Sequence, residues 1–422
     1  MKKVYPNPEN TTITPFRQLG LRRHYGEGGG CSGQAVKTVA VAMSGGVDSS
    51  VSAALLKEQG CNVVGFFMKN WGDDTRGLKK SDCPWVEDRE DAMAAAAKLD
   101  IPFHTLDFEE EYKNQVLDYF FKEYEKGRTP NPDIMCNARI KFGVFLEKSL
   151  EMGADMIATG HYARLAPVIL SEAKNPVNVE TSGIYSRDPS PTAQDDVYFR
   201  LLKARDQNKD QTYFLYRLTQ QQLSKSMFPI GGYTKPEVRE MAKKFGLPNH
   251  DKKDSQGVCF IGHLDLKEFL SQKIKNKKGD IVASDGQKIG THDGLFSYTI
   301  GQRKGINVGG TGPYYVVRKD FKNNELIVTN NSKDEHLYSS EVIIEDVNWI
   351  VGSASSRDAA PRASAGCECR IRYREKLTKC EVKPLGRKKY SVKFKIPQWA
   401  IASGQSVVFY NGDACLGGGI IE

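Results

Sequence analysis

Short apolar runs alternate with amphipathic stretches through the first half of the chain. Apolar or β-branched runs, typical of buried strands, occupy residues 36–43, 61–68, 101–106 and 154–161. Patterns with helical periodicity occupy residues 51–59, 86–99, 109–126 and 138–152. Strands separated by helices of this length form parallel βαβ units, so the pattern predicts an α/β domain with helices on both faces of a parallel sheet.

The second half has a different pattern. From Gly279 onward the helical periodicity ends, and short strand patterns alternate with Gly, Asn and Asp turns. These strand patterns lie at residues 281–282, 314–317, 325–328 and 342–344. Short strands with frequent turns indicate a small β-rich domain followed by a second, barrel-like one.

Composition shifts suggest the domain boundaries. Residues 1–35 are rich in Pro and Gly and are expected to form a disordered extension; the polar run at 166–196 is expected to be a surface insert. We predict a catalytic α/β domain at residues 36–271, a central β-rich domain at residues 272–337 and a C-terminal β-barrel at residues 338–422. The sequence has no apolar run of membrane-spanning length and no recognisable cleavable leader, so we expect a cytoplasmic protein with no membrane partner.

The sharpest break in the pattern is Ser44-Gly-Gly-Val-Asp-Ser49, which joins the first strand to a helix that Asp48 or Ser49 would cap and Gly60 would end. Paired glycines let backbone N–H groups approach an anion closely, and the helix N-terminus adds its own donors and the positive end of its dipole. The G-x-x-x-x-G-K-[ST] motif is absent, so the loop is not of the Walker type. The pattern predicts a phosphate site; the alternative is a tight turn that binds nothing.

Three other residues are predicted to lie beside this loop. Met68, Gly160 and His161 stand where predicted strands end, and ligands of parallel sheets bind outside the carboxyl ends of the strands. We therefore expect these residues on the same side of the sheet as the loop. For Met68 the alternative is ordinary core packing.

Two of the nine cysteines have surroundings that suggest reactivity. Cys136 precedes a helix that is expected to begin near Ala138, and the helix dipole would lower the pKa of a thiol in that place. Asp133, three residues earlier, can serve as a base or a hydrogen-bond acceptor. Cys259 follows Lys252 and Lys253 in a turn, an exposed and electropositive setting. The alternative for each thiol is a structural role, and the odd count without a C-x-x-C pair argues against a disulfide framework or a zinc ribbon.

The last domain carries an alternating pattern of charge. In residues 367–374 the odd positions are Cys, Cys, Ile and Tyr, whereas the even positions are Glu, Arg, Arg and Arg and would face the other side of a strand. Residues 391–396 repeat the scheme with lysines outward. Together with the net charge of +8, this favours a basic barrel face that contacts a phosphate backbone. The alternative is a solvated face whose charges discourage edge pairing.

Taken together, the motifs resemble those of the tRNA-specific 2-thiouridylases, which belong to the PP-loop ATP pyrophosphatases, and the bacterial form in particular. The resemblance runs from about Val36 to Glu422, and only the extension before Val36 and the insert at 166–196 depart from it. It implies a Rossmann-like first domain of the adenine nucleotide alpha hydrolase type. The motifs that carry it occur in the family's order and are Ser44-Gly-Gly-Val-Asp-Ser49, Phe67-Met-Lys-Asn-Trp71, Gly127-Arg-Thr-Pro-Asn-Pro-Asp133, Met135-Cys-Asn137, Ala158-Thr-Gly-His-Tyr162, Lys209-Asp-Gln211, Gly257-Val-Cys-Phe-Ile-Gly262, Gly301-Gln-Arg-Lys-Gly305 and Cys415-Leu-Gly-Gly-Gly-Ile-Ile421.

The resemblance implies ATP-dependent 2-thiolation of the wobble uridine of tRNA. ATP would adenylate the C2 oxygen, with the loop and Mg²⁺ holding the departing pyrophosphate. Cys259 would be the persulfide carrier, loaded by a sulfur-relay protein or a cysteine desulfurase. Cys136 would close a transient disulfide with Cys259 or first form an adduct at C2, and the residues do not choose between these routes.

The resemblance also assigns binding residues. The ATP-binding set is Ala42, Met43, Ser44, Gly45, Gly46, Val47, Asp48, Ser49, Met68 and Gly160. The set around the target base is Asn131, Pro132 and Asp133. Further tRNA contacts would come from His161, Lys209, Asp210, Gln211, Arg372, Tyr373 and Gln405. A base that is modified must leave its stack, which a single-stranded anticodon loop makes easy.

Two other functions fit parts of the sequence. Another adenylating PP-loop enzyme, such as an argininosuccinate or GMP synthetase, would leave Cys136, Cys259 and the basic barrel face without a role. A non-catalytic RNA-binding protein with a relic loop would leave the intact Ser44-Gly-Gly-Val-Asp-Ser49 without one.

Overall fold

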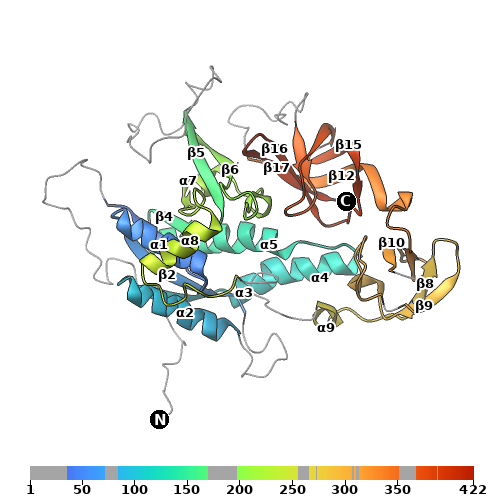
Figure 1. Ribbon diagram of the computed structural model, residues 1–422, viewed down its shortest axis with the longest axis horizontal. Coiled ribbons are helices and arrows are strands. Elements are labelled where there is room, and N and C mark those ends of the chain that lie inside the picture. The colour runs from blue at the N-terminus through green and yellow to red at the C-terminus, as the bar shows by residue number, and fades with distance from the viewer. Residues whose placement is uncertain are drawn as a thin grey trace, which may run out of the picture.

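The computed structural model describes residues 36–71, 84–169, 197–254, 266–271, 273–306, 308–309, 313–350, 367–386 and 388–422. Figure 1 shows the predicted catalytic domain on the left, a barrel at the upper right and a smaller β domain at the lower right. The predicted extension at 1–35 and the thiol of Cys259 lie outside the described residues.

The first domain is built on a parallel sheet, as the alternating pattern predicts. Its strands are β1 (Thr38–Ala42), β2 (Asn62–Lys69), β3 (Phe103–Asp107), β4 (Met156–Thr159) and β7 (Ser226–Met227). They run in the order β3-β2-β1-β4-β7, and every pair is parallel. The loop that follows β1 therefore lies in the middle of the carboxyl edge, where ligands of such sheets bind.

Alternate residues of β1 face two separate apolar cores, which is why the whole strand is apolar. Val39 and Val41 pack with α1 (Val47–Glu58), α2 (Pro84–Lys98) and α8 (Lys235–Lys244). Ala40 and Ala42 face the other core, which contains the helical segments between Glu109 and Glu151. The sheet is thus covered on both faces, as predicted.

Two long helical stretches cover that second face, and each contains a π-helical segment. The first consists of α3 (Glu109–Tyr112), η3 (Lys113–Leu117) and α4 (Asp118–Glu125). The second consists of α5 (Pro132–Met135), η4 (Cys136–Val144) and α6 (Phe145–Glu151). The prediction that the second stretch begins near Ala138 is wrong, because Asn131 caps it at Pro132: its side chain accepts hydrogen bonds from the backbone N–H groups of Asp133 and Ile134.

A hairpin of β5 (Ala163–Ile169) and β6 (Val197–Lys203) leaves the catalytic domain. Ala166 pairs with Arg200 and Ile169 with Val197. The predicted start of the insert at residue 166 is therefore wrong, because residues 166–169 belong to strand β5. Its first residues are strand because they meet an antiparallel partner, which the local sequence does not reveal; residues 170–196 lie outside the described part. β6 also pairs with the barrel strand β17 (Ala414–Ile421).

The central domain is a small sheet with its own core. Its strands β8 (Gly279–Ala283), β9 (Lys288–His292), β10 (Tyr315–Asp320) and β11 (Glu325–Thr329) lie in the order β10-β11-β8-β9. Ile281, Val316, Leu326 and Val328 form its buried centre. Shorter elements of the described chain include η6 (Thr212–Phe214), α7 (Gln220–Ser224), α9 (Leu266–Ser271), η7 (Leu295–Ser297) and η8 (Glu335–Leu337).

The last domain is a closed six-stranded barrel, as expected. Its strands are β12 (Tyr338–Trp349), β13 (Glu368–Arg370), β14 (Thr378–Gly386), β15 (Lys389–Trp399), β16 (Ser406–Asn411) and β17. The order is β12-β15-β14-β13-β16-β17, and pairing of β12 with β17 closes the ring. Inward residues such as Ile344, Val392 and Phe409 fill its interior.

The predicted basic face of the barrel is only half confirmed. Lys393 and Lys395 of β15 are exposed while Phe394 points inward, as the alternation predicts. The prediction of a strand at 367–374 is wrong, because β13 ends at Arg370 and the chain then turns. Arg370 is only 7% exposed, so its guanidinium group lies in the interior and does not contribute to the surface charge. None of the helices in the described ranges has the length and apolar character needed to cross a bilayer.

Candidate active site

The loop between β1 and α1 has the backbone geometry of an anion cradle. Gly45 has φ +76°, and a Cβ on it would lie 2.1 Å from the carbonyl oxygen of Asp88, so only glycine fits there. Gly46 is the extended N-cap residue of α1. The predicted caps Asp48 and Ser49 are therefore wrong, since both lie inside the helix; the hydroxyl of Ser49 donates to the Gly46 carbonyl at 3.1 Å.

Hydrogen bonds within and behind the loop fix its shape. The backbone N–H of Ser44 donates to Ser49 Oγ at 3.2 Å, which joins the two ends of the motif. Behind it, the buried side chain of Asn249 donates to the Gly45 carbonyl at 2.8 Å and to Ser50 Oγ at 3.0 Å. Asn249 was not predicted as a site residue, because it lies some 200 positions away and no local motif marks it.

The other residues predicted to bind ATP fall into two groups. Ala42, Met43, Val47 and Met68 are buried, so any nucleotide contact from them would come mainly through the backbone. Ser44, Gly46 and Asp48 are at least partly open to solvent. Gly160, at the end of β4, lies directly against the start of α1, since a Cβ there would be 2.6 Å from the Ser49 nitrogen.

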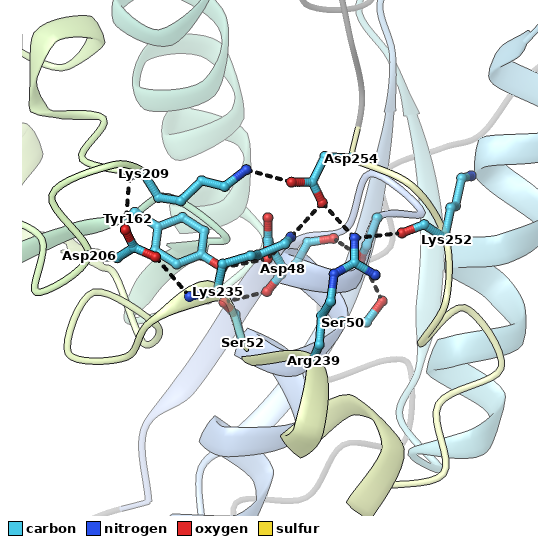
Figure 2. A network of polar contacts seen from close by, with 12 residues as sticks. Asp48, Ser50, Ser52, Tyr162, Asp206, Lys209, Lys235, Arg239, Lys252 and Asp254 are labelled. Atoms are coloured by element: carbon cyan, nitrogen blue, oxygen red, sulfur yellow. Dashed lines mark hydrogen bonds and ion pairs between the residues drawn. The ribbon is translucent and has the colours of Figure 1, made fainter. Parts of the chain in front are cut away.

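Asp48 is the centre of a polar network that the sequence did not reveal (Figure 2). Its Oδ1 accepts a hydrogen bond from the Tyr162 hydroxyl at 2.8 Å and another from Lys235 Nζ at 2.7 Å. Burial and the nearby Asp48 carboxylate raise the pKa of Tyr162, so this phenol stays protonated and donates. Both bonds end on Oδ1, and the carboxylate is 31% exposed.

A second carboxylate completes the network. Asp254 lies among Lys209 at 2.5 Å, Lys235 at 2.8 Å and Arg239 at 3.0 Å (Figure 2). Burial alone would raise the pKa of Asp254, but hydrogen bonds from Lys209 and Lys235 outweigh it and lower the pKa to about 2. Asp254 is therefore ionised at neutral pH, and it is the last described residue before the segment that contains Cys259.

The electropositive setting predicted for Cys259 is partly wrong. Lys252 lies 2.7 Å from Asp88 and 2.5 Å from Asp91, both on α2, so these carboxylates offset its charge. Lys253 is exposed. The two acidic partners come from an element more than 160 positions earlier, which is why the local sequence suggested a net positive turn.

Cys136 is buried inside a helix and does not precede one. Because α5 begins at Pro132, the positive end of the helix dipole acts on Asp133 in the first turn and has faded one turn later at Cys136. The dipole argument for a lowered thiol pKa is therefore wrong. Asp133 lies on the same helical stretch, and its part as a base or hydrogen-bond acceptor stays a prediction.

The loop that carries Asn131, Pro132 and Asp133 is held by all three domains. The backbone N–H of Thr129 donates to the Ser403 carbonyl at 2.7 Å, and Gln405 Nε2 donates to the Thr129 carbonyl at 2.7 Å, both from the barrel. The Thr129 hydroxyl also lies 3.2 Å from that of Thr299 in the central domain. The side chain of Gln405 therefore holds this loop in place.

The remaining residues predicted to contact tRNA lie in two segments, residues 209–211 and 372–373. A hydrogen bond from Arg374 Nε to the Asn208 carbonyl, 3.0 Å long, joins these segments. Arg372 donates to the Ala400 carbonyl and lies over the Trp399 ring, and Tyr373 contacts Phe214. Within residues 209–211, the Lys209 side chain is partly exposed to solvent.

Three predicted tRNA contacts have their side chains turned to internal partners. Asp210 is 1% exposed, accepts from the backbone N–H of Ala204 and lies 3.6 Å from Arg370. Gln211 accepts from the Tyr162 backbone N–H at 2.8 Å. His161 is buried with Nδ1 2.8 Å from Thr159 Oγ1, and burial holds its pKa well below the usual value, so the ring is neutral. The Asp210 carboxylate is therefore not accessible to solvent.

The donor set for a metal ion is small. The described residues contain no group of three or more His, Cys, Asp and Glu side chains that could hold an ion. Mg²⁺ commonly takes one or two carboxylates plus the phosphates of its substrate. Asp48, part-exposed and at the loop, fits that arrangement through Oδ2, the oxygen on which neither the Tyr162 nor the Lys235 bond ends.

A parallel-sheet domain with a Ser-Gly-Gly-Val-Asp-Ser loop at its central strand, joined to two β domains, defines an enzyme of the PP-loop ATP pyrophosphatase class. Three family models match in the same order: the tRNA methyl transferase HUP domain over residues 37–263, the tRNA methyl transferase PRC-barrel domain over 267–330 and the aminomethyltransferase β-barrel domain over 339–421.

Full-length relatives make the assignment more specific. The tRNA-specific 2-thiouridylase MnmA of Geobacillus thermodenitrificans is 46% identical over 91% of this chain and 94% of its own length. The proteins of the same name from Staphylococcus aureus (strain bovine RF122 / ET3-1) and Legionella pneumophila are each 45% identical over 91% of this chain and cover 95% and 98% of their own. The chain belongs to the tRNA-specific 2-thiouridylase family.

Proposed function

We propose that this enzyme replaces the C2 oxygen of the wobble uridine of tRNA with sulfur and consumes ATP in doing so. The observation that carries the proposal is the Ser44–Ser49 cradle at the carboxyl end of β1, in a chain 46% identical to a protein named a 2-thiouridylase. A synthetase of the same loop class would leave unexplained why the loop at Asn131–Asp133 is clamped by a barrel and a central domain.

The carbonyl oxygen of uracil is a poor leaving group, so it must first be activated. In the proposed reaction the C2 oxygen attacks the α-phosphorus of ATP, and pyrophosphate departs into the Ser44–Ser49 loop. The N-terminus of α1 and the loop N–H groups stabilise its charge. Mg²⁺, held by Asp48 and the phosphates, would supply further charge neutralisation when bound.

Sulfur then displaces AMP. In one route the terminal sulfur of a Cys259 persulfide attacks C2 and AMP leaves; the Cys136 thiolate next attacks Cys259 Sγ, which frees thiouridine and forms a Cys136–Cys259 disulfide. In the other route the Cys136 thiolate adds to C2 and AMP leaves; a thiol reductant attacks Sγ of the Cys259 persulfide, forms a disulfide with Cys259 and releases hydrosulfide, which displaces Cys136 from C2. A sulfur-relay protein or a cysteine desulfurase would load Cys259, and a thiol reductant would reopen the disulfide.

The two cysteines are 123 positions apart (259 minus 136), so the fold or a rearrangement on tRNA binding must bring them together. We propose that Asn131, Pro132 and Asp133 surround the flipped base near Cys136. Lys209, Arg372 and Tyr373 are proposed to face the RNA. For His161, Asp210, Gln211 and Gln405 we propose an indirect part, since their side chains hold neighbouring segments of the protein.

A single-turnover assay tests this function. The native protein is mixed with ATP, a sulfide or persulfide source and unmodified tRNA that carries a wobble uridine, and thiouridine in digested RNA is scored beside released AMP. Thiouridine and AMP from the native protein, with loss of persulfide-dependent thiouridine in C259S, support the proposal. AMP without thiouridine would show that the adenylated substrate is a different one.

A further inference from the structure

The nucleotide loop has no cation of its own. Its one charged residue is Asp48, so a bound pyrophosphate would bring several negative charges next to a carboxylate. The cation in contact with Asp48 is Lys235, whose Nζ lies 2.7 Å from Oδ1 although the two residues are 187 positions apart in sequence. Lys235 thus places a positive charge beside the loop.

Lys235 is held firmly in this place. It is the first residue of α8, and Thr234 and Glu237 form a capping box around it. Its backbone N–H donates to Asp206 at 2.9 Å, and its side chain is only 11% exposed. Because α1 begins at Val47 and α8 at Lys235, the positive ends of two helix dipoles also meet near Asp48.

Asp254 directs the Lys235 ammonium from the other side, at 2.8 Å. Asp254 also has Lys209 and Arg239 as partners, so its charge stays balanced when Lys235 turns toward an anion. Asp48 likewise keeps the Tyr162 hydroxyl. The arrangement lets Lys235 gain a phosphate partner while each of the two half-buried carboxylates keeps another donor.

We propose that Lys235 is a catalytic residue of the adenylation step, which contacts the pyrophosphate part of ATP, and that Asp254 is the residue that positions it. The inference rests on the proposed function. In that step a bond forms between the C2 oxygen and the α-phosphorus, the bond from the α-phosphorus to the bridging oxygen breaks, and the electron pair departs with pyrophosphate. The ammonium of Lys235 neutralises the charge gained by that leaving group.

Three variants test the proposal: K235M removes the charge, K235R keeps it, and K243M is the matched control. Lys243 lies in the last turn of the same helix, is exposed and pairs with Glu240 at 2.9 Å. In single turnover with saturating ATP and tRNA, we expect K235M to release AMP about 100- to 1,000-fold more slowly, the range seen when one preorganised charge-stabilising donor is lost. K235R should recover at least about tenfold of that loss, and K243M should stay within about threefold of native.

Calorimetric titration with inorganic pyrophosphate adds a readout that does not depend on turnover. We expect K235M to bind this probe about tenfold more weakly, and K243M and K235R to bind it like the native protein. Thermal unfolding of each variant shows whether it is folded; if K235M is not, K235Q takes its place in both measurements. Native-like AMP release and pyrophosphate binding by the neutral variant would overturn the proposal, as would equal losses in K235M and K243M. A native protein that makes no AMP or thiouridine would instead count against the proposed function.

Discussion

Gly160 lies so close to Ser49 that a Cβ on the glycine would sit 2.6 Å from the serine backbone nitrogen. This contact places the end of β4 against the first turn of α1. Any side chain at position 160 would push the helix N-terminus, and with it the Ser44–Ser49 loop, away from its place in the sheet edge. Glycine here is a requirement of the nucleotide site and not of a turn, because its φ is not in the left-handed region.

The first prediction follows from this contact. Gly160→Ala should lower the rate of AMP formation by about 100-fold, the scale expected when reacting groups are misplaced by about 1 Å. The control is Gly232→Ala, because a Cβ at Gly232 meets nothing within 4 Å. Single-turnover AMP release measures both variants, and equal rates in the two would contradict the role given to Gly160.

Arg370 and Asp210 form a buried pair, 3.6 Å apart and 7% and 0% exposed. We expect Arg370→Met to lower the free energy of unfolding by about 3 kcal/mol, because it leaves a buried carboxylate without its cation. Arg374→Met, at an exposed arginine on the adjoining turn, should change it by less than about 1 kcal/mol. Urea unfolding followed by circular dichroism gives both values. A loss below about 1 kcal/mol in Arg370→Met would show that the pair is not needed for stability.

Asp254 should make the stability depend on pH in the acid range. Its pKa is lowered from 3.8 to about 2 in the folded protein, so its pairing with Lys209, Lys235 and Arg239 stabilises the fold above about pH 4 and is lost as the pH falls toward 2. After allowance for solvent screening, this is about 1–2 kcal/mol at neutral pH.

The measurement compares native protein with Asp254→Asn in urea at pH 7 and at pH 3. The difference in unfolding free energy should be present at pH 7 and smaller at pH 3. Asp251→Asn, at a nearby exposed position, serves as the control and should give no such difference. If the difference in unfolding free energy between the native protein and Asp254→Asn is the same at pH 7 and pH 3, the lowered pKa of Asp254 is contradicted.

Lys319 should make the stability rise with pH as well, but in the alkaline range. Burial lowers the pKa of this lysine in β10 to about 8, while its Nζ donates to the Tyr298 carbonyl at 2.9 Å. Between pH 8 and about 10 the unfolded chain holds a proton that the folded chain has released, so stability gains from Lys319 as the pH rises through this window. Lys319→Met should abolish this rise; denaturation at pH 7.5 and 9.5 tests it, and an unchanged pH slope in the variant would refute it.

Short-range patterns predicted the parallel sheet, the phosphate loop and the order of the domains, because strand periodicity and paired glycines are local signals. The start of the helix at Pro132 was also available from the sequence, since Asn131 followed by proline is a cap signal. The Asp48–Lys235–Asp254 network could not be predicted. Its members lie on different elements, and only the packing of α8 against α1 makes them partners.

The misread strand at residues 367–374 has a physical reason of the same kind. Alternation of Arg with apolar residues suggests an outward basic face, but Arg370 is drawn inward by Asp210 and by the Tyr410 ring. A buried partner from another domain overrides the local alternation. Outward lysines of β15 have no such partner among the described residues, and there the alternation holds.

The hairpin of β5 and β6 has a mechanical consequence. Because β6 pairs with β17 at Leu201 and Leu202, the backbone hydrogen bonds of the barrel continue without a break into a strand of the catalytic domain. The barrel is therefore joined to the catalytic domain by backbone hydrogen bonds as well as by the chain, and these bonds resist rotation of one domain against the other.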